Sequence, residues 1–90
     1  MLKSLEELIK TIRDRKYNPK ENSYTSKLLA DKKLSLDKVK EEIQELIESI
    51  EKDTNKIHEG ADVIYHLLVY LEANEIKIED IIEELKKRKK

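Results

Sequence analysis

The sequence predicts an all-α fold, a five-helix antiparallel bundle, and three observations support this prediction. The 90 residues are 43% charged and 38% hydrophobic, and they are rich in Glu, Lys, Leu and Ile, which favour helices. A single Gly and a single Pro leave few interruptions. Apolar residues recur at helical spacing in successive segments, whereas no segment alternates as a strand does. A chain of this length predicts one domain over residues 1–90.

The first two helices are expected on either side of a loop. Ser4 and Glu7 have the spacing of a capping box, so the first helix is expected to begin at Ser4 and to end near Lys16. The segment 17–23 contains an Asn-Pro pair and predicts a loop. A short second helix is expected over residues 24–33.

A long helical hairpin is expected in the middle of the chain. Ser35 is the expected N-cap of the third helix, which ends at the break over residues 52–55. Asp53 or Thr54 is then expected to cap the fourth helix, which runs to about Ala73. One apolar stripe marks the third helix, formed by Leu36, Val39, Ile43, Leu46, Ile47 and Ile50.

The fourth helix is apolar around most of its circumference. A helix of this kind is normally buried, and one chain of this size would leave much of it uncovered. We therefore expect a homodimer that shares this helix, and the alternative is a monomer with a thick helical core. The main apolar face comprises Ile57, Ala61, Ile64, Leu67, Leu68 and Leu71, with Val63, Tyr65, Val69 and Tyr70 on its flanks.

The last segment of the chain is basic. A fifth helix is expected from Ile78 to about Arg88, and residues 86–90 (KKRKK) are interpreted as a solubilising helix end, with a nucleic-acid or membrane-binding tail as the alternative. The net charge is −1, without the basic excess of a polyanion-binding protein. There is no Cys, no evident signal peptide and no apolar run long enough to span a bilayer. We expect a cytoplasmic protein with no nucleic-acid and no membrane partner.

Two consecutive helices each carry two acids three residues apart, Glu42 with Glu45 and Glu59 with Asp62. This spacing places both carboxylates of a pair on one helix face. Asp62 and His66 lie in the most apolar run of the chain, where an unpaired carboxylate is costly. If the two pairs faced each other, Mg²⁺ would relieve their repulsion, and facing helices often build metal sites this way. The alternatives are solvated acids on the third helix and a purely structural Asp62–His66 pair.

The residues around these acids resemble a known family. KVKEEIQE (38–45) followed by EGADVIYHLL (59–68) resembles the paired E-x-x-E and E-x-x-D helices of MazG-like all-α nucleotide pyrophosphohydrolases. SYTSKLL (23–29) and the YHLL ending narrow the resemblance to phosphoribosyl-ATP pyrophosphohydrolases. The opening LEELIKTIRDRK and the closing IEDIIEELKKR are also similar to that family, so the resemblance covers nearly the whole chain.

The resemblance implies a MazG-like bundle and Mg²⁺-dependent hydrolysis of phosphoribosyl-ATP to phosphoribosyl-AMP and pyrophosphate, the second step of histidine biosynthesis. Glu42, Glu45, Glu59 and Asp62 match the metal-binding acids. Glu42 or Glu45 is the first candidate for the base that accepts a proton from water, with Glu41 beside them as a supporting or base residue. The implied substrate-binding residues are Arg15, Ser23, Tyr24, Thr25, Lys27, Lys38 and His66.

Two positions depart from the family pattern. Lys40 stands where the family often has Gly, and Gly60 stands where it often has Ala. Two other functions stay open at this point. One is a house-cleaning pyrophosphohydrolase acting on other nucleoside triphosphates, against which the SYTSKLL and YH residues argue. The other is a helical dimerisation module without catalytic activity.

Overall fold

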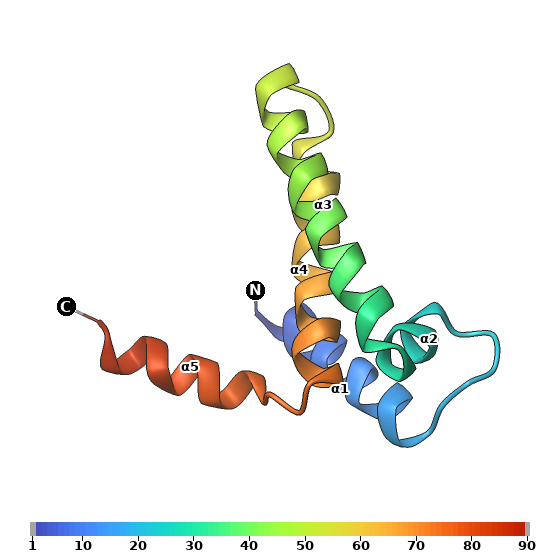
Figure 1. Cartoon of the computed structure of the whole chain (residues 1–90). Coiled ribbons are helices and arrows are strands. Elements are labelled where there is room, and N and C mark those ends of the chain that lie inside the picture. The colour runs from blue at the N-terminus through green and yellow to red at the C-terminus, as the bar shows by residue number, and fades with distance from the viewer. Residues whose placement is uncertain (1, 90) are drawn as a thin grey trace.

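The structure is a computed structural model that describes residues 2–89. Residues 2–89 form five α-helices and no β-strand, so the all-α prediction is confirmed. Figure 1 shows how these helices are arranged. No helix in that range is both long and apolar enough to cross a membrane. The helices are α1 (Lys3–Tyr17), α2 (Tyr24–Ala30), α3 (Lys32–Lys52), α4 (Lys56–Ala73) and α5 (Ile78–Lys87).

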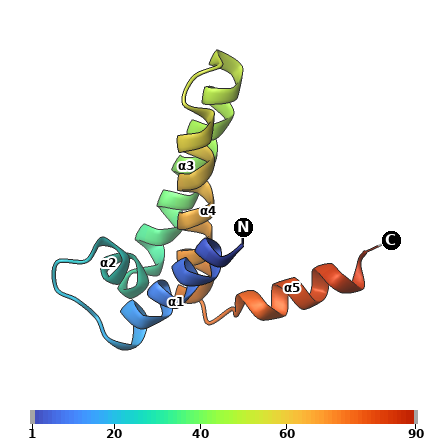
Figure 2. The same ribbon diagram turned by 180° about the vertical axis from the view of Figure 1, so that it is seen from behind.

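The two longest helices, α3 and α4, form a hairpin. The two helices run antiparallel and are joined by a tight turn at one end, while α1 and α2 pack near the other end (Figures 1 and 2). Asp53 and Asn55 in the turn have φ angles of 56° and 44°, a left-handed conformation that Asp and Asn tolerate better than most residues. The chain then leaves the hairpin, and α5 extends away from the other helices.

Several helix starts differ from the prediction because other residues supply the caps. The predicted capping box is wrong, since α1 begins at Lys3 after Leu2, without a side-chain cap, and Ser4 lies inside the helix. The predicted cap at Ser35 is also wrong. The Asp31 carboxylate accepts a hydrogen bond of 3.0 Å from the Leu34 amide and starts α3 four residues earlier. Because Asp31 caps the next helix, α2 ends at Ala30 instead of continuing to residue 33.

The boundaries of α4 and α5 agree better with the prediction. Asn55 precedes α4, so the predicted caps at Asp53 and Thr54 are wrong, and Asp53 instead ends α3 in a left-handed conformation. The end of α4 at Ala73 and the range of α5 are confirmed. Lys90, the last residue of the basic ending, lies outside the described residues.

A small apolar core lies where α1, α2 and α4 meet. Ile12, Leu28 and Val69 are at most 2% exposed and form its centre. Beside it, the buried Glu72 on α4 forms ion pairs with two basic side chains of α1, at 3.5 Å to Arg13 and 3.8 Å to Lys16. This core and these ion pairs hold α1 and α2 against one end of the hairpin.

An apolar face of the hairpin is left uncovered within one chain. On α3 each of its residues follows a buried or half-buried position by one residue, and on α4 Ile64 and Leu67 do the same. Ile57 lies seven residues, about two turns, before Ile64 and so shares its side of α4. Because the two helices are antiparallel, that offset places both sets on the same side of the hairpin. We call this surface the hairpin apolar face; it comprises Ile43, Ile47 and Ile50 of α3 and Ile57, Ile64 and Leu67 of α4, which are between 42% and 90% exposed.

Candidate active site

Four carboxylates meet between the two helices of the hairpin. Helix α3 supplies Glu42 and Glu45, and α4 supplies Glu59 and Asp62, so each i, i+3 pair lies on one helix as the sequence predicts. Glu45 lies close enough to both Glu42 and Glu59 to interact with each of them. Glu42 is only 8% exposed. The structure therefore brings together the two halves of the predicted acidic cluster.

Crowding in this cluster disfavours negative charge. Burial is the main cause that raises the pKa of Glu42, and the neighbouring Glu45 raises it further. Partial burial and the same Glu45 also raise the pKa of Glu59. The buried Oε2 atoms of Glu42 and Glu59 have no hydrogen-bond partner among the described residues. Two carboxylates thus each keep an oxygen that the protein itself does not satisfy.

The donor set fits a hard divalent cation. Two unsatisfied buried oxygens and four neighbouring carboxylates offer oxygen ligands only, the kind that Mg²⁺ prefers. Glu41, Glu42 and Glu45 each offer one ligand atom within a mutual distance of 4.8 Å, and so do His58, Glu59 and Asp62. A cation between α3 and α4 would satisfy the orphaned oxygens and offset the repulsion that raises both pKa values.

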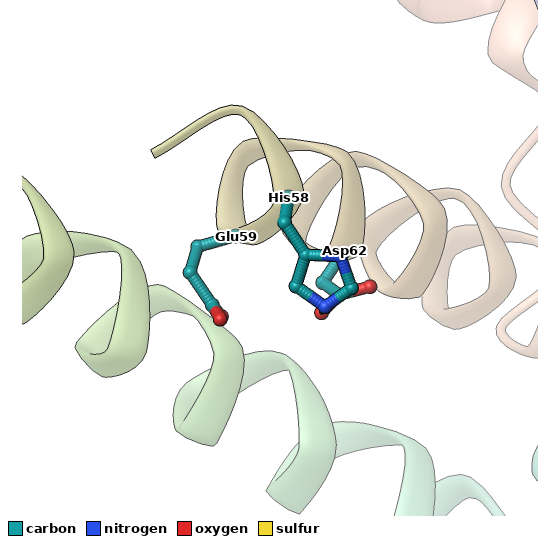
Figure 3. Close-up of side chains that lie close together, drawn as sticks. All are labelled: His58, Glu59 and Asp62. Atoms are coloured by element: carbon teal, nitrogen blue, oxygen red, sulfur yellow. The ribbon is translucent and has the colours of Figure 1, made fainter. Parts of the chain in front are cut away.

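His58 is a neighbour of the cluster that the sequence reasoning missed. Its Nε2 lies 3.3 Å from Oδ2 of Asp62, and Figure 3 shows the ring close to Asp62 while Glu59 reaches toward α3. The two residues are four positions apart on α4, and that spacing could have identified the contact. The His58 side chain is 73% exposed, so this contact lies at the surface.

His66 is buried, and both of its ring nitrogens are engaged by the protein. Nδ1 lies 2.8 Å from the backbone carbonyl oxygen of Asp62, and Nε2 lies 3.1 Å from the hydroxyl of Tyr24. The ring is 6% exposed and sits edge-on to Tyr24 and to Tyr65. His66 therefore ties the start of α2 to the part of α4 that carries Asp62. Its ring nitrogens have no free position for the substrate contact that the family resemblance implies.

A second hydroxyl contact joins the same two helices. The hydroxyls of Thr25 and Tyr65 are within hydrogen-bonding distance, and the rings of Tyr24 and Tyr65 stack with centroids 6.4 Å apart. Burial is the main cause that raises the pKa of Tyr24, while the nearby Lys38 ammonium opposes it. Of the predicted substrate-binding residues, Tyr24, Thr25, Lys38 and His66 therefore lie near one another.

The remaining predicted substrate-binding residues gather around the loop before α2. Ser23 and Lys27 line an open hollow together with Tyr24, and Arg15 lines a neighbouring hollow that also contains Ser23. Arg15 is paired with Asp14 at 2.9 Å. The Ser23 hydroxyl accepts a hydrogen bond of 3.2 Å from the Ser26 amide and so caps α2. Tyr24 is the residue common to this hollow and to the His66 contact.

The match to a known family agrees with this geometry. Residues 5–89 match the family described as Phosphoribosyl-ATP pyrophosphohydrolase. The chain belongs to this family. The predicted family and the predicted phosphoribosyl-ATP pyrophosphohydrolase activity are confirmed.

Relatives of this phosphoribosyl-ATP pyrophosphohydrolase family member occur in bacteria and archaea. The phosphoribosyl-ATP pyrophosphatase of Clostridium novyi is 50% identical over 92 residues, which cover 96% of this chain and 81% of that protein. That of Halobacterium salinarum is 44% identical over 91 residues, covering 94% of this chain and 96% of that protein. A histidine biosynthesis bifunctional protein of Pyrococcus furiosus is 43% identical over 91 residues, covering 100% of this chain and 42% of that protein.

The two departures from the family pattern lie outside the acid positions. Lys40 is an exposed residue of α3. At Gly60 an added methyl group would meet nothing within 4 Å, so the chain itself gives no sign of a close approach there. Both replacements leave the four carboxylates of this phosphoribosyl-ATP pyrophosphohydrolase in place.

Proposed function

We propose that the phosphoribosyl-ATP pyrophosphohydrolase activity of this protein, a step of histidine biosynthesis, depends on Mg²⁺ held by Glu42, Glu45, Glu59 and Asp62. The observation that supports this proposal most directly is the pair of buried, unsatisfied carboxylate oxygens of Glu42 and Glu59 within a cluster of four acids. Carboxylates without a function on a helix surface would be solvated. In this cluster two carboxylate oxygens are buried instead, which disfavours their ionised form.

Hydrolysis of the phosphoanhydride bond requires that the charge on the phosphoryl oxygens is neutralised and that a water molecule is oriented for attack. When bound, Mg²⁺ supplies positive charge to the phosphoryl oxygens. One carboxylate of the Glu42–Glu45 pair accepts the proton of the attacking water. Glu41 is hydrogen-bonded to Lys38 at 3.3 Å and holds this ammonium group near the acids and Tyr24. Lys38 is therefore positioned to bind a phosphate oxygen of the substrate.

The loop before α2 supplies the groups for the phosphate at the other end of the substrate. Arg15 and Lys27 carry positive charge at the two adjoining hollows, and Ser23 lines both. Phosphoribosyl-ATP carries a triphosphate and a separate ribose phosphate, so it requires two anion-binding regions. The cluster between α3 and α4 takes the triphosphate, and the basic hollow takes the single phosphate.

The functional form is a homodimer that completes a MazG-like bundle and works as one domain per chain in the cytoplasm. The hairpin apolar face supports the dimer, because it leaves six large side chains at least 42% exposed on one side of two long helices. A second copy offers the same elongated apolar surface, and two-fold symmetry allows a self-complementary contact. Lys38 and Glu41 precede the buried positions Val39 and Glu42, so they lie on the other side of α3 and remain free for substrate.

The activity is tested with purified protein, Mg²⁺ and phosphoribosyl-ATP, with a panel of deoxynucleoside triphosphates as competing substrates. Pyrophosphate release is expected chiefly from phosphoribosyl-ATP and should stop when the metal is chelated. Glu45→Gln and Asp62→Asn should abolish turnover while the circular-dichroism spectrum stays helical. Glu51→Gln, an exposed change on the same helix α3, serves as the control. Equal turnover of the deoxynucleotides, or full activity in both acid variants, would contradict the proposal.

The dimer is tested by sedimentation at micromolar concentration. The wild type is expected to sediment as a dimer, and Ile47→Glu combined with Ile64→Glu should shift it to a monomer, because burying two new charges in an apolar contact is unfavourable. Leu85→Glu on α5, which is also an exposed apolar position at 61%, is the matched control and should leave the dimer intact. A wild-type monomer would refute the dimer without affecting the assignment of the acids.

A further inference from the structure

An open hollow lies beside the acidic cluster, at the turn end of the α3–α4 hairpin. Two of the proposed Mg²⁺ ligands line it, Glu45 of α3 and Glu59 of α4. Lys52, the last residue of α3, and Thr54 and Asn55 of the turn line it as well. We call this surface the turn hollow. It places an ammonium, a hydroxyl and an amide group next to the proposed metal site.

The ammonium group of Lys52 has no ion-pair partner within residues 2–89. Glu48 lies four residues earlier, at a spacing that favours an ion pair with Lys52, but the Glu48 carboxylate accepts a hydrogen bond of 3.4 Å from the Gln44 amide. Lys56, the other lysine at this turn, is held by the carboxylate of Asp53. Lys52 therefore keeps its charge and three N–H donors for a ligand.

Lys52 lies on the same side of α3 as residues proposed to bind the triphosphate. Lys38, Glu45 and Lys52 follow one another at intervals of seven residues, about two turns, so they form one stripe along the helix. Neighbouring members of this stripe are about 10 Å apart along the helix axis. Ile50, on the hairpin apolar face, is about 200° around the helix from Lys52, so the proposed dimer contact lies on the other side of α3. The Lys52 side chain is exposed and accessible to the substrate.

The two ends of the substrate determine its direction along this stripe. Phosphoribosyl-ATP has its single phosphate at one end and the terminal phosphoryl group of its triphosphate at the other. We placed the single phosphate at the loop before α2, and α2 lies at the end of the hairpin opposite the turn (Figures 1 and 2). With the triphosphate at the acids, its two outer phosphoryl groups therefore extend toward the turn hollow.

These two outer phosphoryl groups leave as pyrophosphate. Hydrolysis adds one water across the bond that joins them to the first phosphoryl group. One phosphorus gains the water oxygen, the other keeps the bridging oxygen with the bonding electron pair, and a carboxylate of the Glu42–Glu45 pair takes the proton. Whichever phosphorus is attacked, the second phosphoryl group gains a charged oxygen that it lacked in the substrate. A cation beside this oxygen therefore stabilises the transition state more than the substrate.

We propose that Lys52 binds the pyrophosphate leaving group in the turn hollow, with the Thr54 hydroxyl and the Asn55 amide as neutral donors beside it. Lys52 is then a catalytic residue at the leaving-group end of the site. This inference rests on the proposed function for its substrate, whereas pyrophosphate binding can be measured without turnover. The alternative role of Lys52, a cation that only complements the dipole of α3, predicts no effect on any ligand.

The binding step is tested by calorimetric titration with pyrophosphate in the presence of Mg²⁺. Lys52→Gln should weaken pyrophosphate binding about 10- to 100-fold, the effect of losing one hydrogen bond between charged groups. The other product, phosphoribosyl-AMP, lacks the two outer phosphoryl groups, so its binding should be the same in the variant and the wild type. A wild type that does not bind pyrophosphate, or a variant that binds it equally well, would overturn the proposal. Equal losses for the two products would overturn it too.

Turnover of phosphoribosyl-ATP provides the second measurement. Lys52→Gln should lower kcat/KM by about 10- to 100-fold, and Lys52→Arg should recover most of this loss because a guanidinium keeps the charge. Lys56→Gln is the matched control, since it removes a lysine of the same turn that does not line the turn hollow, and it should leave kcat/KM unchanged. Full activity of Lys52→Gln, or an equal loss in Lys56→Gln, would contradict the proposal.

The wild-type activity separates this inference from the proposed function. Absence of Mg²⁺-dependent turnover of phosphoribosyl-ATP in the wild type would refute the proposed function. A wild type with that turnover, together with a Lys52→Gln variant that matches it in turnover and in pyrophosphate binding, would refute the inference alone.

Discussion

Replacing Glu42 by Gln should stabilise the metal-free protein while removing its response to Mg²⁺. Glu42 is 8% exposed, and its buried Oε2 has no hydrogen-bond partner among residues 2–89. Its neighbour Glu45 adds like charge. Without a cation, ionised Glu42 is therefore a cost to the folded state. Glutamine keeps nearly the same shape, removes the charge and can donate a hydrogen bond to Glu45.

The expected gain in stability follows from removing the unsatisfied Glu42 carboxylate. Leaving a buried polar group unsatisfied costs about 1–3 kcal/mol, and glutamine, which still buries a polar amide, should recover about 1–2 kcal/mol of this. For a domain of this size each kcal/mol moves the melting temperature by roughly 4–8 °C. Glu42→Gln in a chelator should therefore melt about 4–16 °C above the wild type.

Both the stability gain without metal and the lost response to Mg²⁺ can be measured by thermal unfolding. The unfolding is followed by circular dichroism at neutral pH, first with a chelator and then with saturating Mg²⁺. The metal should stabilise the wild type by about 2.7 kcal/mol at a hundredfold excess over its dissociation constant, and it should have little effect on Glu42→Gln. Glu51→Gln, exposed on the same helix, should stay within about 0.5 kcal/mol of the wild type in both conditions. A Glu42→Gln variant that melts at or below the wild type in chelator would refute this reasoning.

The pH dependence has a definite sign. The pKa values of Glu42 and Glu59 are raised in the folded state, so the folded protein still binds protons at pH values where the unfolded chain has released them. The two ionised carboxylates destabilise the folded protein fully at pH values above their folded pKa. This destabilisation disappears below about 4.3, the usual pKa of a glutamate in an unfolded chain. Acidifying the metal-free wild type from neutrality should reduce this cost, and Glu42→Gln should show a smaller gain.

Three further outcomes can be checked with single variants. Gly60→Ala should raise the free energy of unfolding by about 0.5–1 kcal/mol in a denaturant titration, because an added methyl meets nothing within 4 Å and Ala favours helix; a loss of stability would indicate a close contact made in the dimer. His58→Asn should leave the Mg²⁺ requirement of the activity unchanged, because Mg²⁺ prefers oxygen ligands and the His58–Asp62 pair is exposed; a lost response would make His58 a ligand. The ion pair with Arg13 lowers the pKa of Glu79 to about 2, so it stabilises the fold above about pH 4.5 and fades as pH falls toward 2; Glu79→Gln should abolish that acid-side loss in melting curves, and an unchanged loss would refute the role of this pair.

The sequence predicts the helices better than their first residues. Helical periodicity identifies all five, since it depends on which residues must be buried together. The N-cap of a helix can be supplied by any of several nearby polar residues. In α3 the cap is Asp31 and not Ser35, because the Asp31 carboxylate accepts a hydrogen bond from the Leu34 amide. Ser35, left inside the helix, is 1% exposed, a position that its polarity does not suggest.

In the candidate site, too, sequence spacing identifies residues on one helix but not contacts between distant parts of the chain. The i, i+3 spacing identifies Glu42, Glu45, Glu59 and Asp62, because it needs only the geometry of one helix at a time. It could not show that His66 is engaged on both nitrogens, since one partner, Tyr24, lies 42 residues away in the sequence. The role of a histidine depends on both of its neighbours, and only the folded structure supplies the second.

The two long helices of the hairpin carry the acids and the apolar face at once. Within residues 2–89 no third element separates these two surfaces. A substitution on the apolar side that changes the spacing of the helices therefore also moves Glu42 and Glu45 relative to Glu59 and Asp62. In a mutational scan scored by growth without histidine, packing defects and ligand defects in this hairpin would therefore look alike. Restoration of growth by added magnesium would separate them, because a site that is only widened keeps all its carboxylates.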